Sequence, residues 1–304
     1  MTYQSQTDNG DEPLTQSDRS SQQIKLQDGR ALGYAEYGSP DGKTVFFFHG
    51  FPGSRIDWLM FDADGDPIAS ELNARIIAVD RPGMGLSDFQ PGRKFLDWPA
   101  DVVELADALR LDQFAVLAVS GGGPYGAACA YKKADRLSST AIISGMGPAD
   151  APGTIDGTSW AIPGKPSLIR RLFLMFVTLG LKDPERFKAQ ITGSIAGPDG
   201  ALMKEHPEIA ASIADGWMEA FRSGNAGVQH EAGMYTRPWG YRLQDITAPV
   251  ILWHGGQEDL NVPESVGHYV AEAIPNCQAT FFEAEGHFTL IYNHLKEILG
   301  LLVS

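Results

Sequence analysis

FAVLAVSGGGPY, residues 114–125, is the stretch of this sequence that decides the fold. Its six apolar residues predict a strand buried on both faces, and the alanine-rich run that follows predicts a helix. Ser120 lies between them, at a tight turn that strains the backbone, so the residues two positions away, Ala118 and Gly122, must be small. Glycine is more usual than alanine at the first of these positions. Plain loops also contain such glycine runs, but the flanking strand and helix favour a nucleophile elbow.

Short apolar runs, each ending in a glycine or a polar turn, recur along the chain. They cover residues 43–50, 74–83, 139–145, 249–255 and 279–286. Segments with helical periodicity alternate with them, at residues 98–110, 123–133, 262–274 and 293–303. A turn at Asp28-Gly29 predicts a hairpin at the start of the sheet. The alternation predicts an α/β fold with a mostly parallel sheet and helices on both of its sides.

One long stretch breaks this alternation. Between residues 145 and 249 the patterns are helical, with predicted helices at 166–182, 183–196 and 206–224 and no good strand. We therefore expect three parts. They are a disordered or loosely docked tail at 1–22, a core made of 23–145 and 241–304, and a helical cap inserted at 146–240. The alternative is that these helices form one face of the same domain.

A serine nucleophile needs a base, and the chain has seven histidines. We favour His287, which follows the last apolar run in a Gly286-His287 loop and precedes the C-terminal helix. A loop at the carboxyl end of a strand can reach toward Ser120, because reacting groups gather at that edge of the sheet. His49 and His254, each followed by glycine at a strand end, are predicted to be structural. The other four are expected to be surface or packing residues.

The base in turn needs a carboxylate to orient it. Glu258 and Asp259 both follow the apolar run 249–255, so both are candidates. We favour Asp259, because it lies just before Val262-Pro263, where the next helix is expected to begin; Glu258 is then a solvated neighbour. An acid after one strand and a histidine after the next give the chain order serine, acid, histidine.

Fixed hydrogen-bond donors would complete such a site. The segment 46–53 ends a predicted core strand in a glycine-rich turn at the same edge of the sheet. The backbone N–H groups of Phe51 and Gly121 are therefore expected to converge on one oxygen and form an oxyanion hole. The segment 80–87 is predicted to be a structural turn, with Arg81 and Asp88 available for local ion pairs.

Five motifs in this order resemble those of the α/β-hydrolase superfamily. They are His49-Gly50-Phe51-Pro52, the turn at 80–87, the elbow at Ser120, the segment 259–263 and Gly286-His287. The resemblance covers nearly all of the chain from Ile24, apart from the predicted cap. It implies an eight-stranded, mostly parallel sheet with an inserted cap, a catalytic triad of Ser120, Asp259 and His287, and an oxyanion hole of Phe51 and Gly121. It also implies cleavage of an ester-like bond through an acyl-enzyme.

Composition limits the other functions. Of the 304 residues, 43% are hydrophobic and 20% are charged, as in soluble globular proteins. The net charge of −14 would repel nucleic-acid phosphates and anionic lipids, so neither partner is expected. Cys129 in a helical run and Cys277 in a turn make no disulfide framework, and no metal site or cofactor is predicted. The absence of a recognisable secretion signal or membrane span favours a cytoplasmic enzyme.

Apolar side chains of the predicted cap favour a bulky or apolar substrate, such as an aryl or long-chain ester or a lactone. They are Trp160, Phe173, Met175, Phe176, Trp217, Met218 and Phe221. Most are expected to pack inside the cap, and only Trp217, together with Met146, is taken as a substrate contact. The expected partner is a small-molecule substrate, and a homodimer stays open.

Several other functions use related sites. Epoxide hydrolases and dehalogenases of this fold need a carboxylate at the elbow, so Ser120 argues against both. Carbon–carbon bond hydrolysis and perhydrolysis use the same three residues, and the motifs exclude neither. A ligand sensor that keeps the triad but acts by binding a signal molecule is a further alternative.

Overall fold

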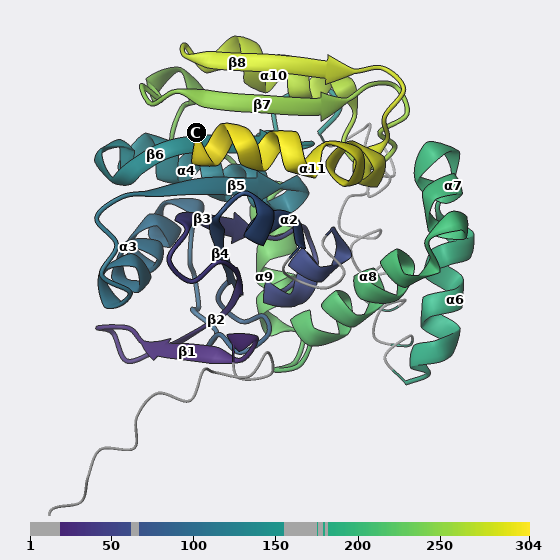
Figure 1. Ribbon diagram of the computed structural model, residues 1–304, viewed down its shortest axis with the longest axis horizontal. Helices are drawn as coiled ribbons and strands as arrows, with labels where there is room; N and C mark the ends of the chain where they lie inside the picture. Colours follow the sequence, from purple (N-terminus) through teal and green to yellow (C-terminus); the bar gives the residue numbers. More distant parts are fainter. Residues whose placement is uncertain (1–18, 62–66, 155–174, 176–178, 180–181) are drawn as a thin grey trace, which may run out of the picture.

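The computed structural model describes residues 19–61, 67–154, 175, 179 and 182–304. At its centre is an eight-stranded sheet in the order β1-β2-β4-β3-β5-β6-β7-β8 (Figure 1). The strands are β1 (Gln22–Lys25), β2 (Ala31–Gly38), β3 (Lys43–Phe48), β4 (Ala74–Val79), β5 (Phe114–Val119), β6 (Leu137–Ile143), β7 (Val250–Gly255) and β8 (Cys277–Phe282). β2 is antiparallel to both β1 and β4, and every other neighbouring pair is parallel. The predicted sheet is therefore confirmed.

The hairpin at the start of the sheet forms where the sequence predicts it. β1 and β2 pair in a register that sets Lys25 opposite Ala31. Gly29 has a φ of 90°, which a side chain would disfavour, so the glycine allows the tight turn. The sheet begins one residue before the predicted core boundary, because Gln22 is already in β1.

The six apolar runs predicted as strands are β3 to β8, but they are not equally buried. β5 is buried at all six positions, since neighbouring strands and helices cover it on every side. β8 is the edge strand and is half-buried or exposed throughout, so the expectation of burial on both faces is wrong there. Cys277 is the first residue of β8 and does not lie in the preceding turn.

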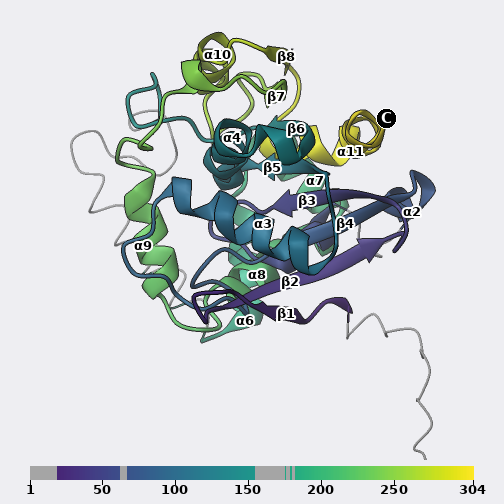
Figure 2. The ribbon, with the colours of Figure 1, turned by 90° about the vertical axis from the view of Figure 1, so that its left-hand side faces the viewer.

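Helices cover both faces of the sheet (Figure 2). On one face pack α2 (Pro67–Glu71) and α11 (His287–Val303); on the other pack α3 (Trp98–Ala108), α4 (Gly123–Lys132) and α10 (Glu264–Ala273). β3 serves both cores, with Val45 and Phe47 on the first face and Phe46 and Phe48 on the second. α11 begins at His287, well before the predicted start at residue 293, so His287 is the first residue of a helix and not a loop residue.

Between β6 and β7 the described elements are helical. They are α6 (Pro184–Ser194), α7 (Gly197–Glu205), α8 (Pro207–Ala220), α9 (Ala226–Met234) and the short 3-10 helix η5 (Leu243–Asp245). α6 and α8 match predicted helices, whereas α7 and α9 were not predicted. The predicted helix at 166–182 lies almost entirely outside the described residues. We refer to residues 146–240 as the insertion; α6 and α7 lie on the side toward which β7 and β8 point (Figure 1).

Two further expectations concern the N-terminal tail and the absence of a membrane-spanning helix. The predicted tail lies outside the described residues up to residue 18, and Arg19 then donates a hydrogen bond to the Gly38 carbonyl at 2.9 Å. In the described ranges no helix is both long and apolar enough to cross a bilayer.

Candidate active site

The turn at Ser120 has the geometry of a strained elbow. Ser120 follows β5 directly and has a φ of 54°, a left-handed conformation that residues with side chains rarely adopt. The glycines after it are required by close packing. A Cβ on Gly122 would lie 2.3 Å from the Phe48 carbonyl oxygen, and one on Gly121 would lie 2.5 Å from the Phe51 Cβ. The end of β3 thus lies directly against the elbow.

Alanine replaces the usual glycine before the serine, and α4 compensates for the larger side chain. A Cβ on Gly126 would lie only 2.7 Å from the Ala118 methyl carbon. Ala118 is fully buried, so its methyl group has no other direction in which to move. Gly126, one turn into α4, therefore leaves the space that Ala118 occupies.

His287 and Asp259 meet at the carboxyl edge of the sheet. The His287 Nδ1 lies 3.0 and 3.1 Å from the two carboxylate oxygens of Asp259, and both side chains are buried. Asp259 is itself held by the N–H groups of Asn261 and Val262, at 3.0 and 2.8 Å. Glu258, the alternative acid, is exposed. The structure thus brings together the two residues favoured for base and acid, while their roles stay predictions.

The surroundings of this pair shift both pKa values in the direction that keeps it charged. Burial disfavours the imidazolium, but the carboxylates of Asp259 and Asp199 outweigh burial and raise the pKa of His287 above its usual value. Burial alone would raise the pKa of Asp259, but the charge and hydrogen bond of His287 lower it. The imidazole of His287 can therefore take up a second proton while Asp259 stays ionised.

The two predicted oxyanion donors lie next to each other. The position that a Cβ on Gly121 would take is 3.0 Å from the Phe51 nitrogen, and a Cβ on Gly50 would lie 3.9 Å from the Ser120 Oγ. Each donor's peptide group is anchored at its carbonyl oxygen. Gly50 O, in the peptide that carries the Phe51 N–H, accepts from Arg81 Nη2 at 2.7 Å. Ser120 O, in the peptide that carries the Gly121 N–H, accepts from the Met146 N–H at 2.9 Å.

A buried charged cluster lies against the loop that follows β3, where Arg81 donates to the carbonyl oxygens of His49 and Gly50, and we call it the Arg81 cluster. It consists of Arg81, Arg93, Glu231, Tyr125 and Tyr235. Glu231, on α9, pairs with Arg81 at 2.7 Å and with Arg93, and it accepts hydrogen bonds from the hydroxyls of Tyr125 and Tyr235. Burial would raise the pKa of Glu231, but the two guanidinium groups hold it well below its usual range. The prediction that Arg81 makes local ion pairs is wrong, because its partner comes from the insertion.

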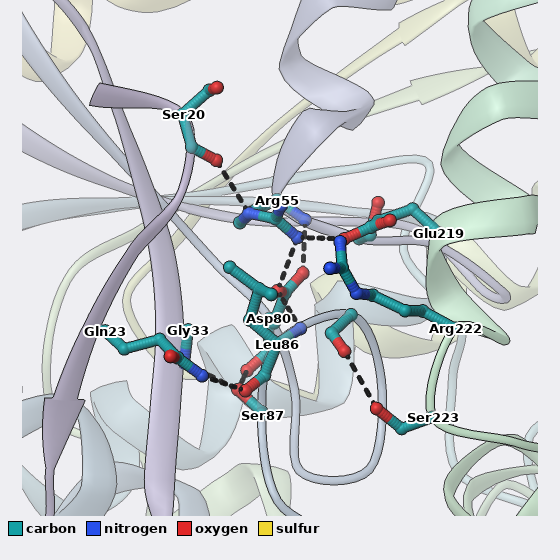
Figure 3. Close-up of polar contacts among 12 residues, drawn as sticks. Ser20, Gln23, Gly33, Arg55, Asp80, Leu86, Ser87, Glu219, Arg222 and Ser223 are labelled. Carbon is teal, nitrogen blue, oxygen red and sulfur yellow. Dashed lines mark hydrogen bonds and ion pairs between the residues drawn. The ribbon is translucent and has the colours of Figure 1, made fainter. Parts of the chain in front are cut away.

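The turn at 80–87 is structural, as predicted. The Asp80 carboxylate accepts from the Leu86 N–H at 2.8 Å and from the Arg55 N–H at 2.6 Å, and it pairs with the Arg55 guanidinium (Figure 3). Arg55 also pairs with Glu219 of α8 at 2.6 Å. A second charged contact between core and insertion therefore lies at this turn, and we call it the Arg55 junction.

The remaining predicted residues are the two histidines expected to be structural and the apolar residues expected near the substrate. His49 and His254 are fully buried, and the Nδ1 of each lies 2.8 Å from the carbonyl oxygen of the glycine that follows it. Met146 is half-buried and hydrogen-bonded through its backbone to Ser120. Trp217 packs against Phe187 of α6, with ring centroids 6.0 Å apart. Trp160, Phe173 and Phe176 lie outside the described residues. Contact of Met146 and Trp217 with substrate stays a prediction.

Two acidic residues that the sequence analysis did not single out contact residues of the candidate site or their supports. Glu231 pairs with Arg81, which in turn holds the loop after β3 at the Gly50 carbonyl, and Asp199 of α7 binds the backbone of His287. Neither lies in a recognisable motif. An acid within an amphipathic segment is ordinarily a solvated residue, so a sequence pattern alone does not reveal its burial.

Comparison with known proteins agrees with this geometry. The model of a family described as the alpha/beta hydrolase fold matches residues 43–294. The chain belongs to the α/β-hydrolase fold family. It is 25% identical to a non-heme chloroperoxidase of Streptomyces lividans, over 87% of this chain and 92% of that relative. It is also 25% identical to a 2-hydroxy-6-oxononadienedioate/2-hydroxy-6-oxononatrienedioate hydrolase of Cupriavidus pinatubonensis, over 86% of each.

Solved structures share the fold at lower identity. An esterase from a Rhodococcus species superimposes with a TM-score of 0.66 at 20% identity, over 93% of this chain and 98% of the esterase. At this identity the likeness concerns the α/β-hydrolase fold and leaves the reaction to be argued from the site.

Proposed function

We propose that this α/β-hydrolase is a serine hydrolase that cleaves a carboxylic ester or lactone of an apolar or bulky small molecule through an acyl-enzyme. The observation that carries the proposal is the buried hydrogen bond between the His287 Nδ1 and both oxygens of Asp259, at 3.0 and 3.1 Å. This bond fixes the tautomer that leaves Nε2 free to accept a proton. The strained elbow at Ser120, at the carboxyl end of β5 in the same sheet, supplies the nucleophile.

In the proposed mechanism, His287 Nε2 takes the proton of Ser120 as Oγ attacks the carbonyl carbon. Asp259 stabilises the imidazolium that forms. The tetrahedral oxyanion accepts hydrogen bonds from the Phe51 and Gly121 N–H groups, and the alcohol then leaves with the proton from His287. Water, deprotonated by the same imidazole, attacks the acyl-enzyme and releases the acid and Ser120.

The surroundings of Ser120 support an apolar or bulky acyl or alcohol group. Phe51 lies beside the elbow and makes an edge-on contact with Tyr235, with ring centroids 5.2 Å apart. Met146 also lies next to the elbow, with its backbone N–H bonded to the Ser120 carbonyl at 2.9 Å. Side chains of this kind favour apolar substrate groups over charged ones.

The substrate class can be tested by kcat/KM measurements on two series, p-nitrophenyl esters of increasing chain length and lactones of increasing ring size. We expect turnover of several members, with kcat/KM rising with apolar chain length up to a limiting length. Failure to turn over any ester or lactone, together with failure of a fluorophosphonate to label the protein, would contradict the proposal and favour a ligand-binding protein.

The likeness to a chloroperoxidase and to a hydrolase of a dienedioate, each over more than 85% of this chain, keeps a second candidate in view. Perhydrolysis and carbon–carbon bond hydrolysis can both use a serine, a histidine and an acid. Two assays separate them from ester hydrolysis: cleavage of a β-diketone, and halide oxidation in the presence of peroxide and a carboxylic acid. A kcat/KM for either that exceeds the value for the best ester would replace the ester proposal.

A further inference from the structure

The N-terminus of α11 is bound by an acid from a distant part of the chain. Asp199, in α7 of the insertion, accepts the N–H of His287 at 2.8 Å and the N–H groups of Phe288 and Thr289 at 2.9 Å each. These are the first three residues of α11. The preceding residue, Gly286, has no side chain with which to cap them, so Asp199 satisfies donors that would otherwise be unpaired.

The fit around the Asp199 carboxylate is close. Asp199 is 3% exposed, and a Cβ on Gly286 would lie 2.5 Å from its Oδ1. The glycine before His287 is therefore the residue that lets the carboxylate reach the helix. The Gly286 N–H is satisfied separately, by Thr289 Oγ1 at 2.7 Å. The backbone on both sides of His287 is thus fixed by hydrogen bonds.

We propose that Asp199 is a positioning residue for His287, so that α7 of the insertion takes part in catalysis through the backbone of α11. The proposal rests on the proposed function, in which His287 is the general base. Asp259 fixes the ring of His287, and Asp199 fixes the main chain that carries the ring. Small displacements of a catalytic group are costly, because a misplacement of about 1 Å can lower the rate by roughly 10²-fold.

The charge of Asp199 gives the proposal a second readout. Among the described residues, the charged or titratable groups that face His287 are Asp259 from the loop after β7, Asp199 from α7 and His254 at the end of β7. Burial lowers the pKa of His254. Glu285, in the segment before α11, is instead bonded to Asn293 and paired with His294. Removing the Asp199 charge should therefore lower the pKa of His287, because one of the two carboxylates that raise it is lost.

The test compares Asp199→Asn and Asp199→Ala with a matched control, Glu219→Gln. Glu219 also joins the insertion to the core through an acid, but its ion pairs among the described residues are with Arg55 and Arg222, which lie outside the proposed active site. We expect kcat to fall by about 10²-fold in Asp199→Ala and by less in Asp199→Asn, which keeps one acceptor oxygen, with little change in KM. The acid limb of the pH profile of kcat/KM should move to lower pH in both. Glu219→Gln should keep the wild-type kcat and acid limb.

Two results would overturn the proposal. One is a folded Asp199→Asn variant with the wild-type kcat and acid limb; the other is an equal loss of kcat in Glu219→Gln. Thermal melting of all three variants separates loss of fold from loss of position, and the acid limb of the Asn variant decides the case if the Ala variant does not fold. Failure of the proposed function would look different: either the wild type itself would turn over no ester or lactone, or His287→Ala would retain the wild-type kcat.

Discussion

Two buried charged groups, the His287–Asp259 pair and the Arg81 cluster, differ in what they have to do. The His287–Asp259 pair must gain and lose a proton in each proposed catalytic cycle, and it consists of one imidazole and one carboxylate. The Arg81 cluster holds permanent charges, with Glu231 between two arginines and two tyrosine hydroxyls. A group that gains and loses a proton needs a pKa close to the pH at which it works. A buried group with a permanent charge is instead stabilised by each hydrogen bond or ion pair that it makes. The difference indicates which mutations should alter the reaction and which should alter the fold.

The largest effect on the reaction should come from Ser120→Ala. Without Oγ there is no nucleophile, so kcat should fall by about 10⁴-fold or more while the melting temperature stays near that of the wild type. Steady-state kinetics on the best ester and a thermal melt measure both. Wild-type activity in a folded Ser120→Ala variant would remove the elbow from the mechanism.

Asp259→Asn should have the next largest effect. The amide can present a donor to the His287 Nδ1 and so favours the wrong imidazole tautomer, which should lower kcat by about 10³- to 10⁴-fold. Glu258→Gln is the matched control, because Glu258 is adjacent but exposed, and it should change kcat very little. A larger loss in Glu258→Gln than in Asp259→Asn would reassign the acid.

Glu231→Gln should affect stability more than the pH dependence of the reaction. It leaves Arg81 and Arg93 buried beside a neutral amide, and breaking a buried ion pair from one side costs about 3–5 kcal/mol. Urea denaturation should show this loss, while Glu219→Gln, whose partner Arg55 keeps Asp80, should lose much less. Equal losses in the two variants would mean that the Arg81 cluster is no more important to the fold than the Arg55 junction.

The smallest effect concerns Asp57, in the 3-10 helix η1 (Arg55–Met60), which α8 covers at Gly216. Burial raises the pKa of Asp57 to about 8. A folded-state pKa above the unfolded value means that the folded protein binds the proton more tightly, so stability falls as pH rises from about 4 to about 8. Asp57→Asn removes this titration. Its melting temperature should therefore decline less between pH 6 and pH 9 than that of the wild type, and parallel declines would contradict the assignment.

The two charged groups also show how far the sequence predicts this protein. Ser120, Asp259 and His287 each follow a predicted strand, and the carboxyl ends of parallel strands lie at the same edge of a sheet. The sequence therefore predicts that the three residues lie at that edge. The inner parallel strands, such as β5, were predictable because strands buried on both faces are continuous apolar runs, whereas the burial of the edge strand β8 was not. Helix α11 was placed too late, because its first turn carries His287 and is capped by Asp199 from another element instead of by a local signal.

The partners from the insertion could not be predicted. Glu231 and Asp199 lie in α9 and α7, which are short helices without a clear apolar stripe, and their burial arises only when the insertion packs on the core. Arg81 was expected to pair locally, since nothing in the sequence marks a partner 150 residues away. Tertiary contacts of this kind are determined by packing and not by local pattern.

The central claim, that Ser120 attacks while the Phe51 and Gly121 N–H groups receive the oxyanion, can be tested on a single covalent complex. An alkyl fluorophosphonate would lose fluoride and form a phosphorus–oxygen bond with the attacking serine, and a crystal structure of that adduct would locate it. We predict a bond to Ser120 Oγ, a phosphonyl oxygen within about 3.1 Å of both N–H groups, and His287 beside the adduct. A bond to another residue, or a phosphonyl oxygen turned away from Phe51 and Gly121, would contradict it.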